Sequence, residues 1–147
     1  MTIREATEND LAQLLMLYTH LHDETPLSVD EDTQHLWQSI LNNPSLHYFV
    51  AEWDGQIVST CNLTVIPNLT RGARPYGLIE NVVTHRDYRG KGIGTAILKH
   101  ALAFAWEQGC YKVMLLTGRG EQTERFYEKA GFVRGLKTGF IAKPPGV

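Results

Sequence analysis

Cysteine is scarce in this chain, with only Cys61 and Cys110 among 147 residues. Both lie in apolar stretches, and there is neither a CxxC pair nor a cluster of cysteine and histidine. The pattern predicts two buried free thiols and no metal site. A chain of this length can form one domain, residues 1–147, whose core needs no disulfide or metal to hold it.

Long apolar runs and an excess of positive charge are also lacking. The first residues contain no apolar segment typical of a signal peptide, and no run approaches the roughly 20 residues that span a membrane. The formal net charge is −2, whereas nucleic-acid-binding domains are usually basic. We therefore expect a cytoplasmic protein with no membrane or nucleic-acid partner.

Hydrophobic periodicity and turn signals predict alternating strands and helices. A capping box at Thr7–Asp10 starts the first helix, Asp54-Gly55 joins a hairpin, and Gly109 and Gly131 end the last two helices. The hairpin requires antiparallel pairing, and residues 76–117 form a β-α-β unit with a parallel crossover. We expect a mixed α/β fold, mostly antiparallel, with helices on both faces of the sheet. The predicted strands are 2–6, 47–53, 56–66, 76–84, 111–117 and 132–142. The predicted helices begin near residue 11, near residue 28 or 30, and near residues 93 and 121.

A glycine-rich segment connects the strand 76–84 to the helix that follows it. Alternate glycines allow a ligand to approach the backbone, and the first N–H groups of a helix are free to bind an anion. Nearby basic side chains add positive charge, so the segment is typical of a pyrophosphate-binding loop. It comprises Arg89, Gly90, Lys91, Gly92, Ile93, Gly94 and Thr95.

The spacing of the glycines narrows the choice of ligand. A P-loop requires Gly-Lys-Ser/Thr, but Lys91 is followed by Gly92. A dinucleotide fingerprint has GxGxxG directly after the first strand, and here the spacing is GxGxG. A flexible basic loop without a ligand is the remaining alternative, and the amphipathic helix that begins inside the loop argues against it.

Three motifs in the second half of the chain resemble the GNAT superfamily of acyl-CoA N-acyltransferases. Arg89, Gly92 and Gly94 match its Arg-x-x-Gly-x-Gly signature, residues 79–83 resemble its fourth strand, and residues 126–132 resemble its late helix-to-strand motif. The resemblance implies acetyl-CoA as co-substrate, with no metal. It implies that the loop from Arg89 to Thr95 binds the pyrophosphate and that the backbone of Asn81, Val82 and Val83 pairs with the pantetheine arm.

The same resemblance assigns two catalytic residues. Glu80 is expected to accept a proton from the substrate amine, directly or through water, because burial in an apolar strand would raise its pKa. Its alternative role is a hydrogen bond to backbone or a pair with a substrate cation. Tyr127 is expected to protonate the leaving thiolate, and its alternative role is packing in the core.

The stretch 79–132 is also similar to glucosamine-6-phosphate N-acetyltransferases. It departs from them at Asn81 and Gly118, where they carry acids, so phosphonate and small-amine acetyltransferases are equally possible relatives. For the acceptor side, we expect an acidic helix end around residues 20–24 facing Arg71 and Arg74, which could hold an anionic group.

We therefore predict transfer of acetyl from acetyl-CoA to a primary amine of a small molecule by direct attack. The alternatives are a CoA-binding regulatory module without turnover and a peptide or protein N-acetyltransferase. A homodimer is possible, with Phe132–Ala142 as its edge.

Overall fold

Five strands form one mixed sheet in the computed structural model, which describes residues 1–147. Neighbouring strands pair antiparallel except for the last two, which run parallel. The predicted mixed fold with one parallel crossover is therefore confirmed. In sheet order the strands are β1 Thr2–Glu5, β2 Leu46–Trp53, β3 Gln56–Ile66, β4 Tyr76–Thr84 and β5 Val113–Met114.

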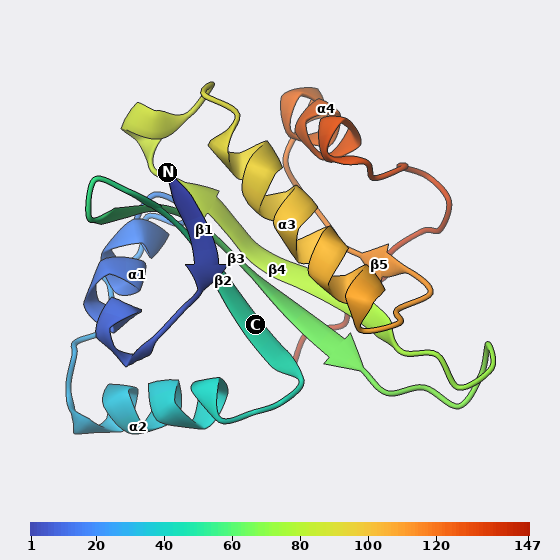
Figure 1. Cartoon of the computed structure of the whole chain (residues 1–147), viewed down its shortest axis with the longest axis horizontal. Coiled ribbons are helices and arrows are strands. Elements are labelled where there is room, and N and C mark those ends of the chain that lie inside the picture. Colours follow the sequence, from blue (N-terminus) through green and yellow to red (C-terminus); the bar gives the residue numbers. More distant parts are fainter.

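Helices cover both faces of this sheet (Figure 1). Helices α1 (Leu11–Tyr18) and α2 (Glu31–Leu41) lie on one face, and α3 (Ile93–Glu107) and α4 (Glu121–Ala130) lie on the other. Each pair encloses a core of its own, one around Leu14 and Trp37 and the other around Phe49 and Ile97. None of the helices is both long enough and apolar enough to cross a membrane.

Local sequence signals account for the element boundaries. Asp54 and Gly55 both adopt positive φ, as a two-residue hairpin turn requires. The Asp30 side chain accepts the Thr33 N–H at 2.9 Å and thereby caps α2. The sequence predicted the bounds of β4 and α4 residue for residue.

The capping box before α1 is tied to the sheet. The Asp10 carboxylate accepts the Thr7 N–H at 2.7 Å and an Arg4 N–H at 2.7 Å, while Arg4 also binds Glu52 on β2 at 2.9 Å. Hydrogen bonding from Arg4 holds the pKa of Asp10 below its usual range. One buried carboxylate thus joins the helix start to β1.

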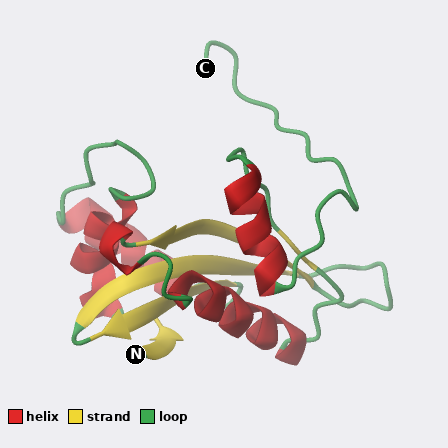
Figure 2. Cartoon of the chain, turned by 90° about the horizontal axis from the view of Figure 1, so that it is seen from above, coloured by secondary structure: helices red, strands yellow, loops and turns green.

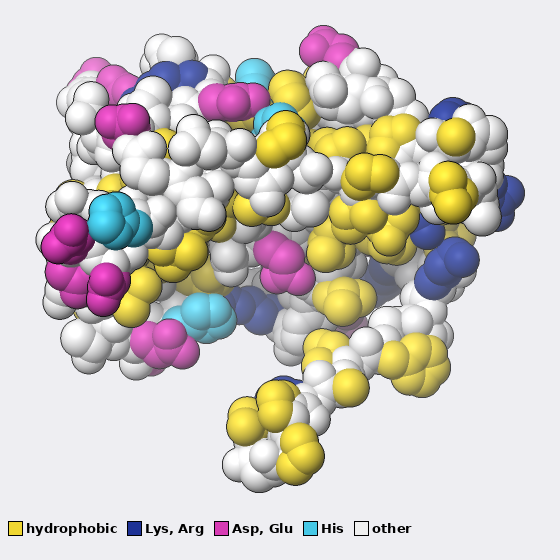
Figure 3. Space-filling model, turned by 90° about the horizontal axis from the view of Figure 1, so that it is seen from below, with side chains coloured by type: hydrophobic (Ala, Val, Ile, Leu, Met, Phe, Trp, Pro, Cys, Tyr) yellow, Lys and Arg dark blue, Asp and Glu magenta, His cyan; other side chains and the backbone are white.

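The end of the chain differs from the prediction. Strand β5 has two residues rather than the predicted 111–117, and the predicted strand Phe132–Ala142 is not formed. A strand needs a partner edge for its backbone hydrogen bonds, and the short β5 offers little edge. Phe132 still packs against the core, but Val133, Leu136, Phe140 and Ile141 are exposed, and the chain runs away from the body (Figures 2 and 3). The homodimer edge assigned to this segment stays a prediction.

Candidate functional site

A cavity of about 950 Å³ opens where β4 and β5 diverge. The two strands pair only at Gly77–Val113 and Leu78–Met114, so beyond Leu78 the edge of β4 toward β5 has no strand partner. We call this the β4–β5 cavity. Residues predicted to bind acetyl-CoA or to catalyse line it: Glu80, Asn81, Val82, Val83, Arg89, Gly90, Gly92, Ile93, Gly94, Thr95 and Tyr127. The Lys91 ammonium instead lies 4.9 Å from the centre of the Tyr88 ring.

The three glycines of the loop have two different physical roles. Gly90 (φ 74°) and Gly92 (φ 79°) adopt left-handed backbone conformations, and a Cβ on either would meet no atom within 4 Å. Gly94 instead allows a close approach, because a Cβ there would lie 3.0 Å from the Phe126 ring and 3.1 Å from the Thr84 hydroxyl. The glycine loop therefore packs directly against the Phe-Tyr motif of α4.

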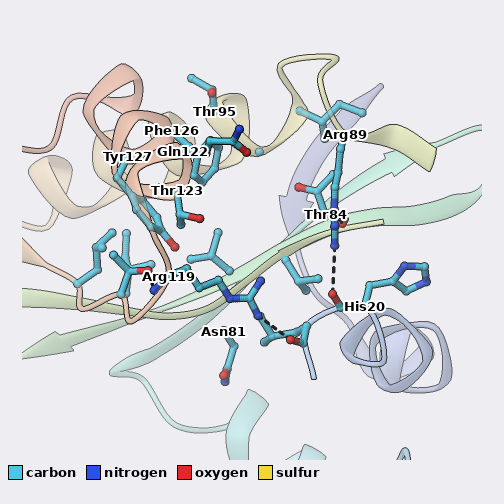
Figure 4. A pocket seen from close by; sticks show the side chains of 18 of the residues that line it. His20, Asn81, Thr84, Arg89, Thr95, Arg119, Gln122, Thr123, Phe126 and Tyr127 are labelled. Carbon is cyan, nitrogen blue, oxygen red and sulfur yellow. Dashed lines mark hydrogen bonds between the residues drawn. The ribbon is translucent and has the colours of Figure 1, made fainter. Parts of the chain in front are cut away.

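Cations dominate the lining of the β4–β5 cavity. Four arginine or lysine residues line it against the single carboxylate of Glu80: Arg89, Arg119, Arg125 and Lys129. Arg89 also connects the end of β4 to the segment after α1. Its guanidinium donates to the Thr84 carbonyl at 3.0 Å and to the His20 carbonyl at 3.1 Å (Figure 4). Such a field favours an anionic ligand.

A β-bulge interrupts β4 beside the cavity. Thr60 pairs with Val83 and Asn62 with Glu80, so β4 carries one residue more than β3 over this interval. Asn81 takes up the extra residue with φ 53°, a left-handed conformation that asparagine tolerates better than most residues. A bulge leaves backbone groups without a partner in the sheet, which makes them available to a ligand.

The structure corrects the expected burial of Glu80. This residue is exposed, because β5 no longer pairs with β4 at its level. Glu80 lies directly across from Asn62 on β3, which lies across from Tyr48 on β2. Directly opposed residues share one face of the sheet, and Tyr48 packs with α1 and α2. Tyr48, Asn62 and Glu80 therefore form a row of polar residues on the face of the sheet that α1 and α2 cover. Glu80 is the member of this row that lines the β4–β5 cavity.

Tyr127 points from α4 into the cavity (Figure 4). Its ring is half-buried against the core, 5.0 Å from the Phe126 ring and 6.1 Å from that of Phe132. Burial raises the pKa of the Tyr127 hydroxyl, and the nearby Arg119 guanidinium opposes this effect. Tyr127 is thus a protonated hydroxyl near a fixed cation.

Two polar residues were not found from the sequence: Arg119, which lines the cavity, and Asn62, which lies across from Glu80 but lines neither cavity. Arg119, in the turn before α4, donates to the Leu21 carbonyl at 2.6 Å and so bridges the mouth of the cavity to the segment after α1 (Figure 4). The Asn62 side-chain oxygen is buried without a hydrogen-bond partner. No signal in the sequence singles out Asn62, because β3 contains several other polar residues, and nothing near Arg119 in the sequence indicated Leu21.

Neither the cysteines nor the other potential metal ligands form a metal-binding cluster. Cys61 and Cys110 are buried free thiols, as predicted. Burial raises the pKa of Cys61 to about 12 and also raises that of Cys110. No group of three or more His, Cys, Asp or Glu side chains is arranged to hold a metal ion.

Comparison with known proteins agrees with this geometry. Residues 14–132 match the family model described as acetyltransferase (GNAT) family. A glucosamine 6-phosphate N-acetyltransferase from Trypanosoma brucei brucei is 35% identical over 130 residues, which cover 88% of this chain and 87% of that protein. The fold is shared with a solved structure from Agrobacterium tumefaciens strain C58 (TM-score 0.92, 43% identity, 98% and 100% of the two chains). It is also shared with glucosamine-6-phosphate N-acetyltransferase from Arabidopsis thaliana (TM-score 0.86, 25% identity, 97% of each chain). From its motifs, its fold and these relatives, the chain is an N-acetyltransferase that belongs to the GNAT family.

Proposed function

We propose that this protein transfers an acetyl group from acetyl-CoA to a primary amine of a small molecule by direct attack. One observation carries the proposal: a single cavity joins the glycine loop, the β4 bulge, Glu80 and Tyr127. These parts come from separate segments of the chain, and each suits a different portion of the reaction.

The glycine loop would hold the pyrophosphate of acetyl-CoA. The open space at Gly90 and Gly92 leaves their backbone accessible, and the N-terminus of α3 presents N–H groups and a partial positive charge. The pantetheine arm would extend along Asn81–Val83, where the bulge and the missing β5 pairing leave the strand edge free. A backbone N–H near Val82 would then polarise the thioester carbonyl.

Glu80 and Tyr127 would move the two protons of the reaction. A substrate ammonium gives up one proton to Glu80, directly or through water, and the neutral amine attacks the thioester carbonyl. As the carbon–sulfur bond breaks, the Tyr127 hydroxyl protonates the departing thiolate. The Arg119 cation stabilises the tyrosinate that this step leaves behind, and the second proton, which the nitrogen loses as the amide forms, restores the Tyr127 hydroxyl.

Ligand binding is tested first, by thermal shift with acetyl-CoA, CoA and NAD. A ligand at 100 times its Kd stabilises the folded state by about 2.7 kcal/mol, so acetyl-CoA and CoA should raise the melting temperature and NAD should not. The absence of a shift with both CoA species would refute the proposed ligand.

Turnover is tested next, as thiol release from acetyl-CoA in the presence of small amines and of short peptides. Wild-type protein should consume the thioester with a small amine, and Tyr127→Phe should lose roughly 10²-fold or more in kcat with little change in acetyl-CoA affinity. Binding without turnover would favour a regulatory module. Turnover of peptides alone would favour a peptide N-acetyltransferase.

A further inference from the structure

A second cavity, of about 320 Å³, lies between α1, α2 and the segment that connects them. Leu21, His22 and Asn81 line both this α1–α2 cavity and the β4–β5 cavity, so the two adjoin where the amine would meet the thioester. A volume of this order suits a small organic molecule.

The walls of the α1–α2 cavity are mostly apolar. Its sides come from leucines of α1 and from Trp37 and Ile40 of α2, and two exposed leucines, Leu27 (61% exposed) and Leu36 (55%), stand at its edge. Exposed leucines beside a cavity provide surface that an apolar ligand would remove from water. The cavity therefore favours an apolar body over a polyhydroxylated one.

The α1–α2 cavity also lacks a permanent positive charge, since His22 is the only basic side chain in its lining. No arginine or lysine lines it, and its one carboxylate is Glu24. Arg71 and Arg74, expected from the sequence to hold an anion on the acceptor side, line neither cavity and instead lie 5.8 and 5.7 Å from the Tyr111 ring centre. A phosphate placed in this cavity would be desolvated without a counter-charge, which is costly.

One buried polar atom lies on the wall of this cavity, and a second belongs to the residue across from Glu80 on the sheet. The Tyr18 hydroxyl, on a wall of the α1–α2 cavity, has no hydrogen-bond partner, and neither has the Asn62 side-chain oxygen. Asn62 is the cross-strand neighbour of Glu80, so an amide oxygen and a carboxylate lie together on this face of the sheet. The Asn62 amide oxygen and the Glu80 carboxylate can both accept hydrogen bonds from the N–H groups of an ammonium.

We infer that the acceptor is a primary amine with an apolar alkyl or aryl tail rather than a sugar phosphate. Resting on the proposed function, the inference places the ammonium near Glu80 and Asn62 and the tail in the α1–α2 cavity. It separates this chain from its relatives named for glucosamine 6-phosphate.

A homologous series of amines tests the inference. With acetyl-CoA saturating, kcat/KM is measured for ethylamine, butylamine, hexylamine, 2-phenylethylamine and glucosamine 6-phosphate. Each buried methylene contributes about 0.8 kcal/mol, which corresponds to a roughly fourfold rise in kcat/KM per methylene until the cavity is filled. Hexylamine and 2-phenylethylamine should exceed both ethylamine and glucosamine 6-phosphate by more than tenfold.

Leu36→Gln and Met16→Gln form a matched pair for this assay. Both residues are exposed apolar side chains on a helix, but Leu36 lines the α1–α2 cavity and Met16 lines neither cavity. Leu36→Gln should lower the ratio of hexylamine to ethylamine activity severalfold, whereas Met16→Gln should preserve it. Melting temperatures of both variants check that the fold is retained.

The outcomes separate the two proposals. A flat alkylamine series, or a higher kcat/KM for glucosamine 6-phosphate than for hexylamine, overturns the inference while acetyl transfer to amines stands. No thioester consumption with any amine refutes the proposed function and the inference with it. A steep series that Leu36→Gln flattens and Met16→Gln does not supports both.

Discussion

Replacing Gly92 by alanine separates the conformational role of this glycine from its role in binding. Gly92 adopts φ 79°, where a Cβ meets no atom within 4 Å but strains the backbone. The left-handed conformation costs an L-residue roughly 1–2 kcal/mol. For a domain of this size, that cost lowers the melting temperature by roughly 2–8 °C.

Gly55 provides a control with the same backbone strain. It also has φ 79° and open space around it, but it lies in the β2–β3 turn and lines neither cavity. Gly55→Ala should therefore destabilise the protein about as much as Gly92→Ala. The two variants differ only in whether the added methyl group lies in the proposed pyrophosphate-binding loop.

Acetyl-CoA binding should distinguish the two variants. Loss of one hydrogen bond to a charged group costs about 1.5–3 kcal/mol, so Gly92→Ala should raise the Kd for acetyl-CoA by roughly tenfold to a hundredfold. At a concentration 100 times the wild-type Kd, a tenfold weaker ligand stabilises by about 1.4 kcal/mol instead of about 2.7. Gly55→Ala should retain the full ligand-induced shift.

Gly92→Asn sharpens the test, because asparagine tolerates the left-handed conformation and should recover part of the lost stability. It still places a side chain where the ligand would lie, so it should not recover binding. A wild-type Kd in Gly92→Ala would refute the assignment of the loop. Equal loss of binding in Gly55→Ala would attribute the effect to stability alone.

Three further predictions concern the base, an ion pair and the thiols. Glu80→Gln should lower kcat by roughly 10²–10⁴-fold without changing the acetyl-CoA shift, and an unchanged kcat would remove Glu80 from the mechanism. Asp10→Asn should reduce the free energy of unfolding at pH 7 by about 1–3 kcal/mol. Because Arg4 lowers the folded pKa of Asp10, this contribution is present above the unfolded value of 3.8 and is lost as pH falls through the folded pKa. The difference between the two proteins in urea unfolding should therefore shrink toward pH 2, and a constant difference would contradict the role of the pair. Burial raises the pKa of both cysteines, so Cys61 and Cys110 should resist a thiol reagent at pH 8 until the protein is unfolded, and rapid native labelling would show that they are accessible.

Where the signals are local, the sequence predicted the structure well. The Asp54-Gly55 turn, the bounds of β4 and α4, and the glycine-rich start of α3 each follow from residues within a few positions of one another. The prediction was wrong for the strand 132–142, because a strand depends on a distant edge that β5, with two residues, does not supply.

Contacts between segments that are distant in the sequence could not be predicted from it. The hydrogen bond from Arg119 to the Leu21 carbonyl joins residues 98 positions apart. The exposure of Glu80 follows from the divergence of β4 and β5 after Leu78, whereas an apolar strand with one acid predicted burial. The α1–α2 cavity likewise exists only because two helices and their connection pack over the sheet.

The sequence by itself determined the family and located the loop proposed to bind pyrophosphate, because the backbone conformations and helix start of that loop lie within seven consecutive residues. Only the tertiary structure revealed the features of the proposed acceptor end. The charges, apolar walls and unpaired polar atoms there come from β2, β3, β4, α1 and α2 together. Their combined effect depends on packing and on the local loss of water, which no single segment encodes.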